Sequence, residues 1–136
     1  MVVKKTSVET YLTCYHNVMH NILLVRDTVP LSEIKTLAKE IYGTMIKGVV
    51  DLDREIIALG GEWHMDANNA LIANGSQQPN LWGFNIIFGL PHDQWIEYHS
   101  LINIRPAQGN RSQEIKDEKL RDQMREIIDK RIDTSS

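Results

Sequence analysis

Two stretches of alternating apolar residues, separated by a short turn, constrain the fold of this chain more than any other feature. The first stretch consists of Trp82, Phe84, Ile86 and Phe88. The second repeats the pattern with Ile96, Tyr98, Ser100, Ile102 and Ile104. A period of two places alternate side chains on one face of a β-strand. Residues 89–94 contain Gly, Pro and Asp, which are typical of a turn. The sequence therefore predicts a long antiparallel hairpin at the centre of a sheet.

The rest of the chain mixes helix and strand signals without a regular order. An apolar stripe at helical spacing predicts a helix that begins after Ser32 and contains Ile34, Leu37, Ala38, Ile41, Tyr42 and Met45. Short apolar runs predict strands at 22–26, 49–52 and 55–59, and residues 62–73 favour a short helix. A final amphipathic helix is marked by Leu120, Met124, Ile127 and Ile128. This order predicts an α+β fold, with a mainly antiparallel sheet of about four to five strands and two or three helices packed on one face.

The first 20 residues differ from the remainder of the chain. Val8, Leu12, Tyr15 and Met19 fall at steps of four, three and four, which is the spacing of a short helix. The polar face of this helix is weak, however. We therefore interpret residues 1–20 as an N-terminal appendage with helical spacing, and residues 21–136 as a single α+β domain.

Charge and cysteine content exclude several classes of protein. The chain has 15 basic and 18 acidic residues, so it lacks the basic excess of a nucleic-acid-binding domain. Cys14 is the only cysteine, which rules out an intramolecular disulfide and fits a reducing, cytoplasmic setting. The longest apolar run, residues 22–25, is far shorter than the roughly 20 residues of a membrane span. We expect a cytoplasmic protein without membrane or nucleic-acid partners, and we predict no metal and no cofactor.

A polar loop at residues 103–112 is the first candidate site. It contains Arg105, Gln108, Asn110, Arg111 and Ser112 and no acidic residue. Arginine binds planar oxyanions through two parallel hydrogen bonds, so the loop is typical of a site for an anion or for an acidic group of a partner. The alternative is a structural loop, in which these side chains bind carboxylates and turn carbonyls.

His99 is a further candidate ligand residue. The expected strand places it on the same face as Glu97, Asn103 and Arg105. Such a row of side chains lines either a cleft or the solvated side of a sheet.

His64 and Asp66 are weaker candidates for acid–base catalysis. In an extended segment their spacing of two puts both side chains on one face, where Asp66 orients His64 as a general base. In a helix, His64 points away from Asp66. A small hydrolase of this kind would use Arg105 or Arg111 to stabilise negative charge. The first hypothesis is thus a binding module, and its alternatives are this hydrolase and a structural homo-oligomer, such as a homodimer, without a small-molecule site.

Four sequence blocks resemble a family of short prokaryotic proteins that is described only as a domain of unknown function. The blocks are residues 49–52 (VVDL), 58–62 (ALGGE), 80–83 (NLWG) and 100–112 (SLINIRPAQGNRS). The last block is the most specific, and the resemblance spans residues 22–132. Residues 1–18, Trp63 and residues 68–69 depart from the pattern. The resemblance implies no established activity, cofactor or catalytic residue.

Overall fold

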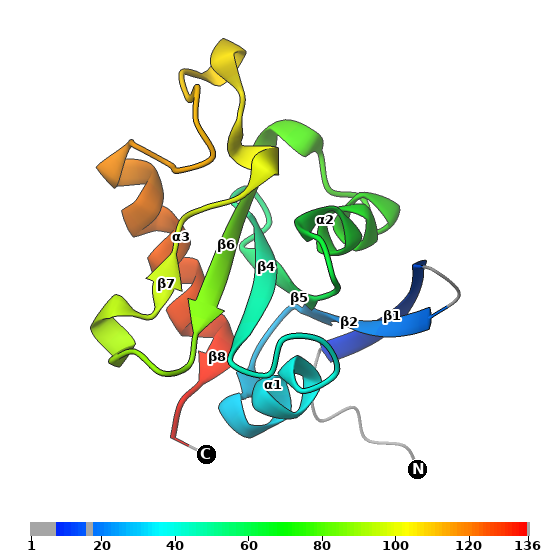
Figure 1. The fold of residues 1–136 in the computed structure, drawn as a ribbon. Helices are drawn as coiled ribbons and strands as arrows, with labels where there is room; N and C mark the ends of the chain where they lie inside the picture. The colour runs from blue at the N-terminus through cyan, green and yellow to red at the C-terminus, as the bar shows by residue number, and fades with distance from the viewer. Residues whose placement is uncertain (1–7, 16–17, 136) are drawn as a thin grey trace.

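A computed structural model of the chain describes residues 8–15 and 18–135 and has one main sheet of six strands (Figure 1). In spatial order the strands are β1 (Val8–Tyr15), β2 (Val18–Val25), β5 (Ile56–Gly60), β4 (Met45–Asp51), β6 (Leu81–Ile87) and β7 (Ile96–Glu97). All neighbouring strands in it are antiparallel. A second, parallel pair joins β3 (Val29–Pro30) to β8 (Ile132–Asp133).

Helices cover both faces of the main sheet. On one face, α1 (Leu31–Ala38) and α3 (Glu118–Arg131) enclose the larger core cluster, in which Phe84 is fully buried. On the other face, α2 (His64–Ala73) packs on a smaller cluster. Short 3-10 turns at Gln78–Asn80, His92–Gln94, Leu101–Asn103 and Pro106–Gln108 complete the fold. The α+β prediction is confirmed. The prediction that the helices pack on one face of the sheet is wrong, because β2 and β5 bury alternate side chains in the clusters on both faces.

The hairpin predicted from the alternating residues forms, since β6 pairs antiparallel with β7, but its predicted length and its central position are wrong. β6 forms as predicted, but β7 has only two residues and lies at the sheet edge, while β5 and β4 occupy the centre. A 3-10 turn at Leu101–Asn103 replaces the rest of the expected strand. There the Asn103 side chain takes the role of a strand neighbour, because it accepts a hydrogen bond from the Gly83 N–H (2.8 Å) and donates one to the Gly83 carbonyl (3.0 Å).

Two other segments differ from the sequence prediction. The described part of the N-terminal appendage is extended rather than helical, since residues 8–15 form β1 and residues 18–20 begin its antiparallel partner β2. The rest of that appendage, at 1–7 and 16–17, lies outside the described residues. The first helix ends at Ala38 rather than Met45. Gly43 there adopts a left-handed φ of 75° and its N–H binds the Ala38 carbonyl, which turns the chain into β4.

The remaining predictions of local structure are confirmed. The segment 62–73 forms α2, and the C-terminal amphipathic stripe forms α3 with Met124, Ile127 and Ile128 buried. Gly75, at φ 97°, follows the end of α2 as a helix stop. Within the described ranges, no helix combines the length and the apolar character that crossing a membrane requires.

Candidate functional site

The polar loop 103–112 is held together by its own polar side chains. The Arg105 guanidinium lies over the Trp82 ring at 4.1 Å from the centroid. It donates from Nε to the Ile102 carbonyl and from Nη1 to the Gln78 carbonyl, both at 2.9 Å. Gln108 accepts a further bond from Arg105 and donates to the Pro79 carbonyl. These bonds attach the loop to the segment before β6.

Asn110 organises the other half of the loop. This buried side chain donates from Nδ2 to the carbonyls of Asn103, Ser112 and Glu114, and its Oδ1 accepts from the Lys116 N–H. The Ser112 hydroxyl also donates to the Glu114 carbonyl, whereas Arg111 is exposed. The carbonyl contacts of Asn110 and Ser112 are those of the structural alternative, whereas Arg105 binds backbone carbonyls and not the carboxylate which that alternative assigned to it. The anion-binding role of the loop stays a prediction.

Single substitutions to glutamine separate these two roles of the loop. We expect Arg105→Gln to lower the free energy of unfolding by about 2 kcal/mol, because it removes the stacking on Trp82 and a bond to a backbone carbonyl. Arg111→Gln changes an exposed side chain and should stay within about 0.5 kcal/mol. Urea unfolding measures both values. A rise in wild-type melting temperature with phosphate that both variants lose would contradict the structural reading.

His64 and Asp66 are placed on α2, where a spacing of two turns their side chains to different directions. Asp66 Oδ2 accepts the N–H groups of Glu62 and Trp63, both at 3.0 Å, so it fixes the start of the helix. His64 instead binds the Phe84 carbonyl through Nε2 at 2.9 Å. This is the helical alternative of the sequence analysis, in which Asp66 does not orient His64.

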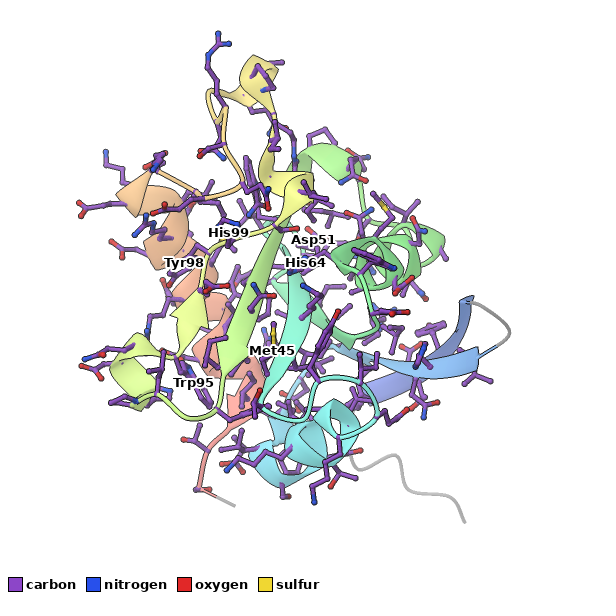
Figure 2. The ribbon with its side chains drawn as sticks, viewed as in Figure 1. Met45, Asp51, His64, Trp95, Tyr98 and His99 are labelled. Carbon is purple, nitrogen blue, oxygen red and sulfur yellow. The ribbon has the colours of Figure 1, made fainter. Side chains whose placement is uncertain are left out.

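His64 does, however, line a cavity of about 510 Å³ on the α2 face of the sheet. We call this the Lys47 cavity, and its lining residues are Met45, Lys47, Trp63, His64, Met65, Asn85, Glu97, His99, Ser100, Leu101, Ile102 and Gln113. In Figure 2, Met45 comes from β4, His64 from the start of α2 and His99 from the segment after β7. Asp66, Arg105 and Arg111 are not among the lining residues, so the proposed hydrolase groups are not gathered in this cavity.

A polar row crosses three strands at the base of the cavity. Lys47 on β4 pairs in register with Asn85 on β6, and Asn85 pairs with Glu97 on β7. Asn85 Nδ2 donates to Glu97 Oε1 at 2.8 Å and to the His99 carbonyl at 3.2 Å. Asn85 is only 4% exposed, and its Oδ1 has no hydrogen-bond partner among the described residues.

The charges of this row are held in a partly buried setting. Burial lowers the pKa of Lys47, and the nearby Glu97 carboxylate opposes that shift. Burial also lowers the pKa of His64 to about 4, and the positive charge of Lys47 acts in the same direction. A neutral His64 that donates from Nε2 to Phe84 keeps its Nδ1 as an acceptor. Within residues 8–15 and 18–135, no group of three His, Cys, Asp or Glu side chains is arranged to hold a metal.

His64 should make the stability of the fold depend on pH. Its pKa of about 4 in the folded state lies below the unfolded value of about 6.5, so the unfolded chain binds more protons between these limits. Stability present above pH 6.5 is therefore lost as the pH falls toward 4. We expect wild type to lose about 2 kcal/mol between pH 7 and pH 5 relative to His64→Gln. Urea unfolding at both pH values checks this, and parallel pH profiles for the two proteins would contradict it.

Sequence reasoning found part of this cavity and missed the rest. The expected row after Ile96 correctly put Glu97 and His99 together, but Asn103 and Arg105 instead support the turn that follows. The sequence patterns do not predict Lys47 or Asn85 as site residues. One signal was available in the sequence. Because both faces of this sheet are covered, a polar residue in the middle of an apolar strand, such as Lys47 in β4 or Asn85 in β6, indicates a site.

Comparison with known proteins agrees with the resemblance seen in the sequence. Searches of curated proteins and of solved structures gave no match. One family model matches residues 23–131, which covers most of the chain and includes all twelve residues that line the Lys47 cavity. The match begins within β2 and so excludes β1. The chain therefore belongs to the family described as "Protein of unknown function (DUF5674)".

Proposed function

We propose that this protein is a binding module for a small organic acid, and that the Lys47 cavity is its binding site. The observation that carries the proposal concerns Lys47, a half-buried lysine at the base of a large cavity. This lysine has no ion-pair partner among the described residues. In the described part of the chain, no carboxylate lies within 4.0 Å of Lys47 Nζ. The ammonium lies over the Tyr42 ring, 5.5 Å from its centroid. A ligand carboxylate would supply the missing partner and offset the cost of burying the charge.

The other walls of the cavity favour an apolar body on this acid. Trp63, Met65 and Leu101 lie at the rim and are 48%, 46% and 64% exposed. Apolar side chains around a few placed polar groups are typical of small-molecule sites, and the volume falls within their usual range of about 300–1,000 Å³.

The polar loop contributes to this proposal as a support rather than as the site. Arg105 binds the Ile102 carbonyl, and Asn103 binds Gly83, so both hold the turn that carries Leu101 and Ile102 against β6. The loop thereby fixes one wall of the cavity. The proposal therefore assigns the acidic group of the ligand to Lys47 rather than to Arg105 and Arg111.

Thermal denaturation with matched probes tests the proposal. At 10 mM, 3-phenylpropionate should raise the melting temperature of the wild-type protein by about 3 to 5 °C, as expected for a ligand with a Kd near 1 mM. Its neutral analogue 3-phenylpropionamide should have a much smaller effect, because it has no charge to pair with Lys47.

Two lysine variants serve as the comparison. Lys47→Met should abolish the effect of the acid, whereas Lys35→Met, at an exposed position of α1 outside the cavity, should retain it. Equal shifts for the acid and the amide, or a full shift with Lys47→Met, would overturn the proposal.

A further inference from the structure

The Lys47 cavity presents a negative charge as well as a positive one. Glu97 lines the same cavity, two strands from Lys47, and uncharged Asn85 lies between them in the register of the sheet. The three strands run side by side (Figure 1). Neighbouring strands are about 4.8 Å apart, so the backbones of Lys47 and Glu97 are separated by about 10 Å.

The two opposite charges do not neutralise each other directly. The ion pairs of the described residues include no Lys47–Glu97 contact within 4.0 Å. Asn85 instead binds Glu97 through Oε1, which leaves Oε2 without a hydrogen bond from another described residue. Each charged group therefore keeps an unused bonding position at the cavity, with an uncharged amide between them.

We infer that the ligand of the Lys47 cavity is a zwitterion of the amino-acid type, with its carboxylate on Lys47, its ammonium on Glu97 and an apolar side chain on the rim. This inference rests on the proposed function and adds to it the amine and the role of Glu97. A zwitterion matches both charges without changing the net charge of the site. It also satisfies Glu97 Oε2 and Lys47 Nζ at once, which an acid without an amine cannot do.

The apolar rim decides which amino acids fit this arrangement. Trp63 offers an aromatic face, and Met65 and Leu101 are flexible or branched apolar side chains. The class that suits such a rim comprises phenylalanine, leucine and methionine, whereas a second charge on the ligand side chain would be left unpaired there.

Isothermal titration calorimetry with the full chain tests the inference. The probes are three pairs of an L-amino acid and the acid that lacks only its ammonium group: phenylalanine and 3-phenylpropionate, leucine and 4-methylpentanoate, and methionine and 4-(methylthio)butanoate. We expect at least one amino acid to bind about tenfold more tightly than its partner acid. For phenylalanine, 2-phenylethylamine, which lacks the carboxylate, should be weaker by a similar factor.

Substitution of Glu97 identifies the origin of this preference. Glu97→Gln keeps an oxygen for Asn85 but removes the charge, so it should reduce the affinity of the amino acid to that of its partner acid. Glu33→Gln, at an exposed position of α1, is the matched control.

Three outcomes would decide against the inference, and they are distinguishable. If each acid binds as tightly as its amino acid, the inference fails and the proposed function stands. If the preference persists in Glu97→Gln, the ammonium is not held by Glu97, and the inference also fails. If neither member of any pair binds, both the inference and the proposed function are overturned.

Discussion

Asn103→Ala should lower the free energy of unfolding by about 4 kcal/mol, although the substitution removes only a few side-chain atoms. The buried Asn103 amide makes two hydrogen bonds to the backbone of Gly83 and a third to the Gln113 carbonyl at 3.2 Å. Each bond contributes about 1 kcal/mol, and leaving the buried polar groups of Gly83 without partners adds the cost of their desolvation. In this variant, the 3-10 turn Leu101–Asn103 is no longer hydrogen-bonded through Asn103 to β6.

Urea unfolding of matched asparagine variants measures this effect. Asn69→Ala, at an exposed position of α2, removes the same group and should change stability by less than about 0.5 kcal/mol. Asn103→Asp keeps an acceptor for the Gly83 N–H but buries a carboxylate against the Gly83 and Gln113 carbonyls, so it should be at least as destabilising as Asn103→Ala. Equal stability of Asn103→Ala and Asn69→Ala would show that the side chain does not replace a strand neighbour.

Gly48→Ala should lower stability by about 3 kcal/mol, which corresponds to about 10 °C in melting temperature. Gly48 pairs with Phe84 across β4 and β6, and the Phe84 ring lies over it. A Cβ at this position would overlap the ring Cζ and lie 2.8 Å from Cε1 and Cε2. Because Phe84 is fully buried in the larger core cluster, its ring cannot move aside without displacing other core residues.

Gly89→Ala is the control for this substitution. A Cβ at Gly89 would have no atom within 4 Å, and the residue does not adopt a left-handed φ. Thermal denaturation should therefore leave Gly89→Ala within about 2 °C of wild type. A melting temperature of Gly48→Ala that also lies within about 2 °C of wild type would mean that the Phe84 ring does not lie against Gly48.

The sequence predicted those elements whose local pattern and tertiary environment agree. The C-terminal helix has an apolar stripe on one side and a solvated face on the other, so its period is visible without knowledge of its neighbours. The alternation through 96–104 was misleading because Ser100 and Asn103 use their side chains to bind backbone groups. A hydrogen bond between residues 20 positions apart leaves no periodic signal.

The candidate site was harder to predict because it depends on the order of the strands. Lys47, Asn85 and Glu97 come from three strands, and only the pairing of β4 with β6 and of β6 with β7 places them in one row. The polar loop, in contrast, was visible because its unusual residues are contiguous. Its Arg105 and Asn110 side chains bind the backbone, so this part of the unusual composition serves to build a turn.

The parallel pairing of β3 with β8 has a consequence for the order of folding during synthesis. Val29 pairs with Ile132, and Arg131 donates to the carbonyls of Asp27 and Glu55. Arg131 is therefore translated 104 residues after Asp27, whose carbonyl it binds. The antiparallel strands β4, β5 and β6 are translated before α3, so they can pair with one another before α3 covers the sheet. Until α3 packs, the face that buries Phe84 lacks the cover that Met124, Ile127 and Ile128 provide, and it is open to water and to chaperones.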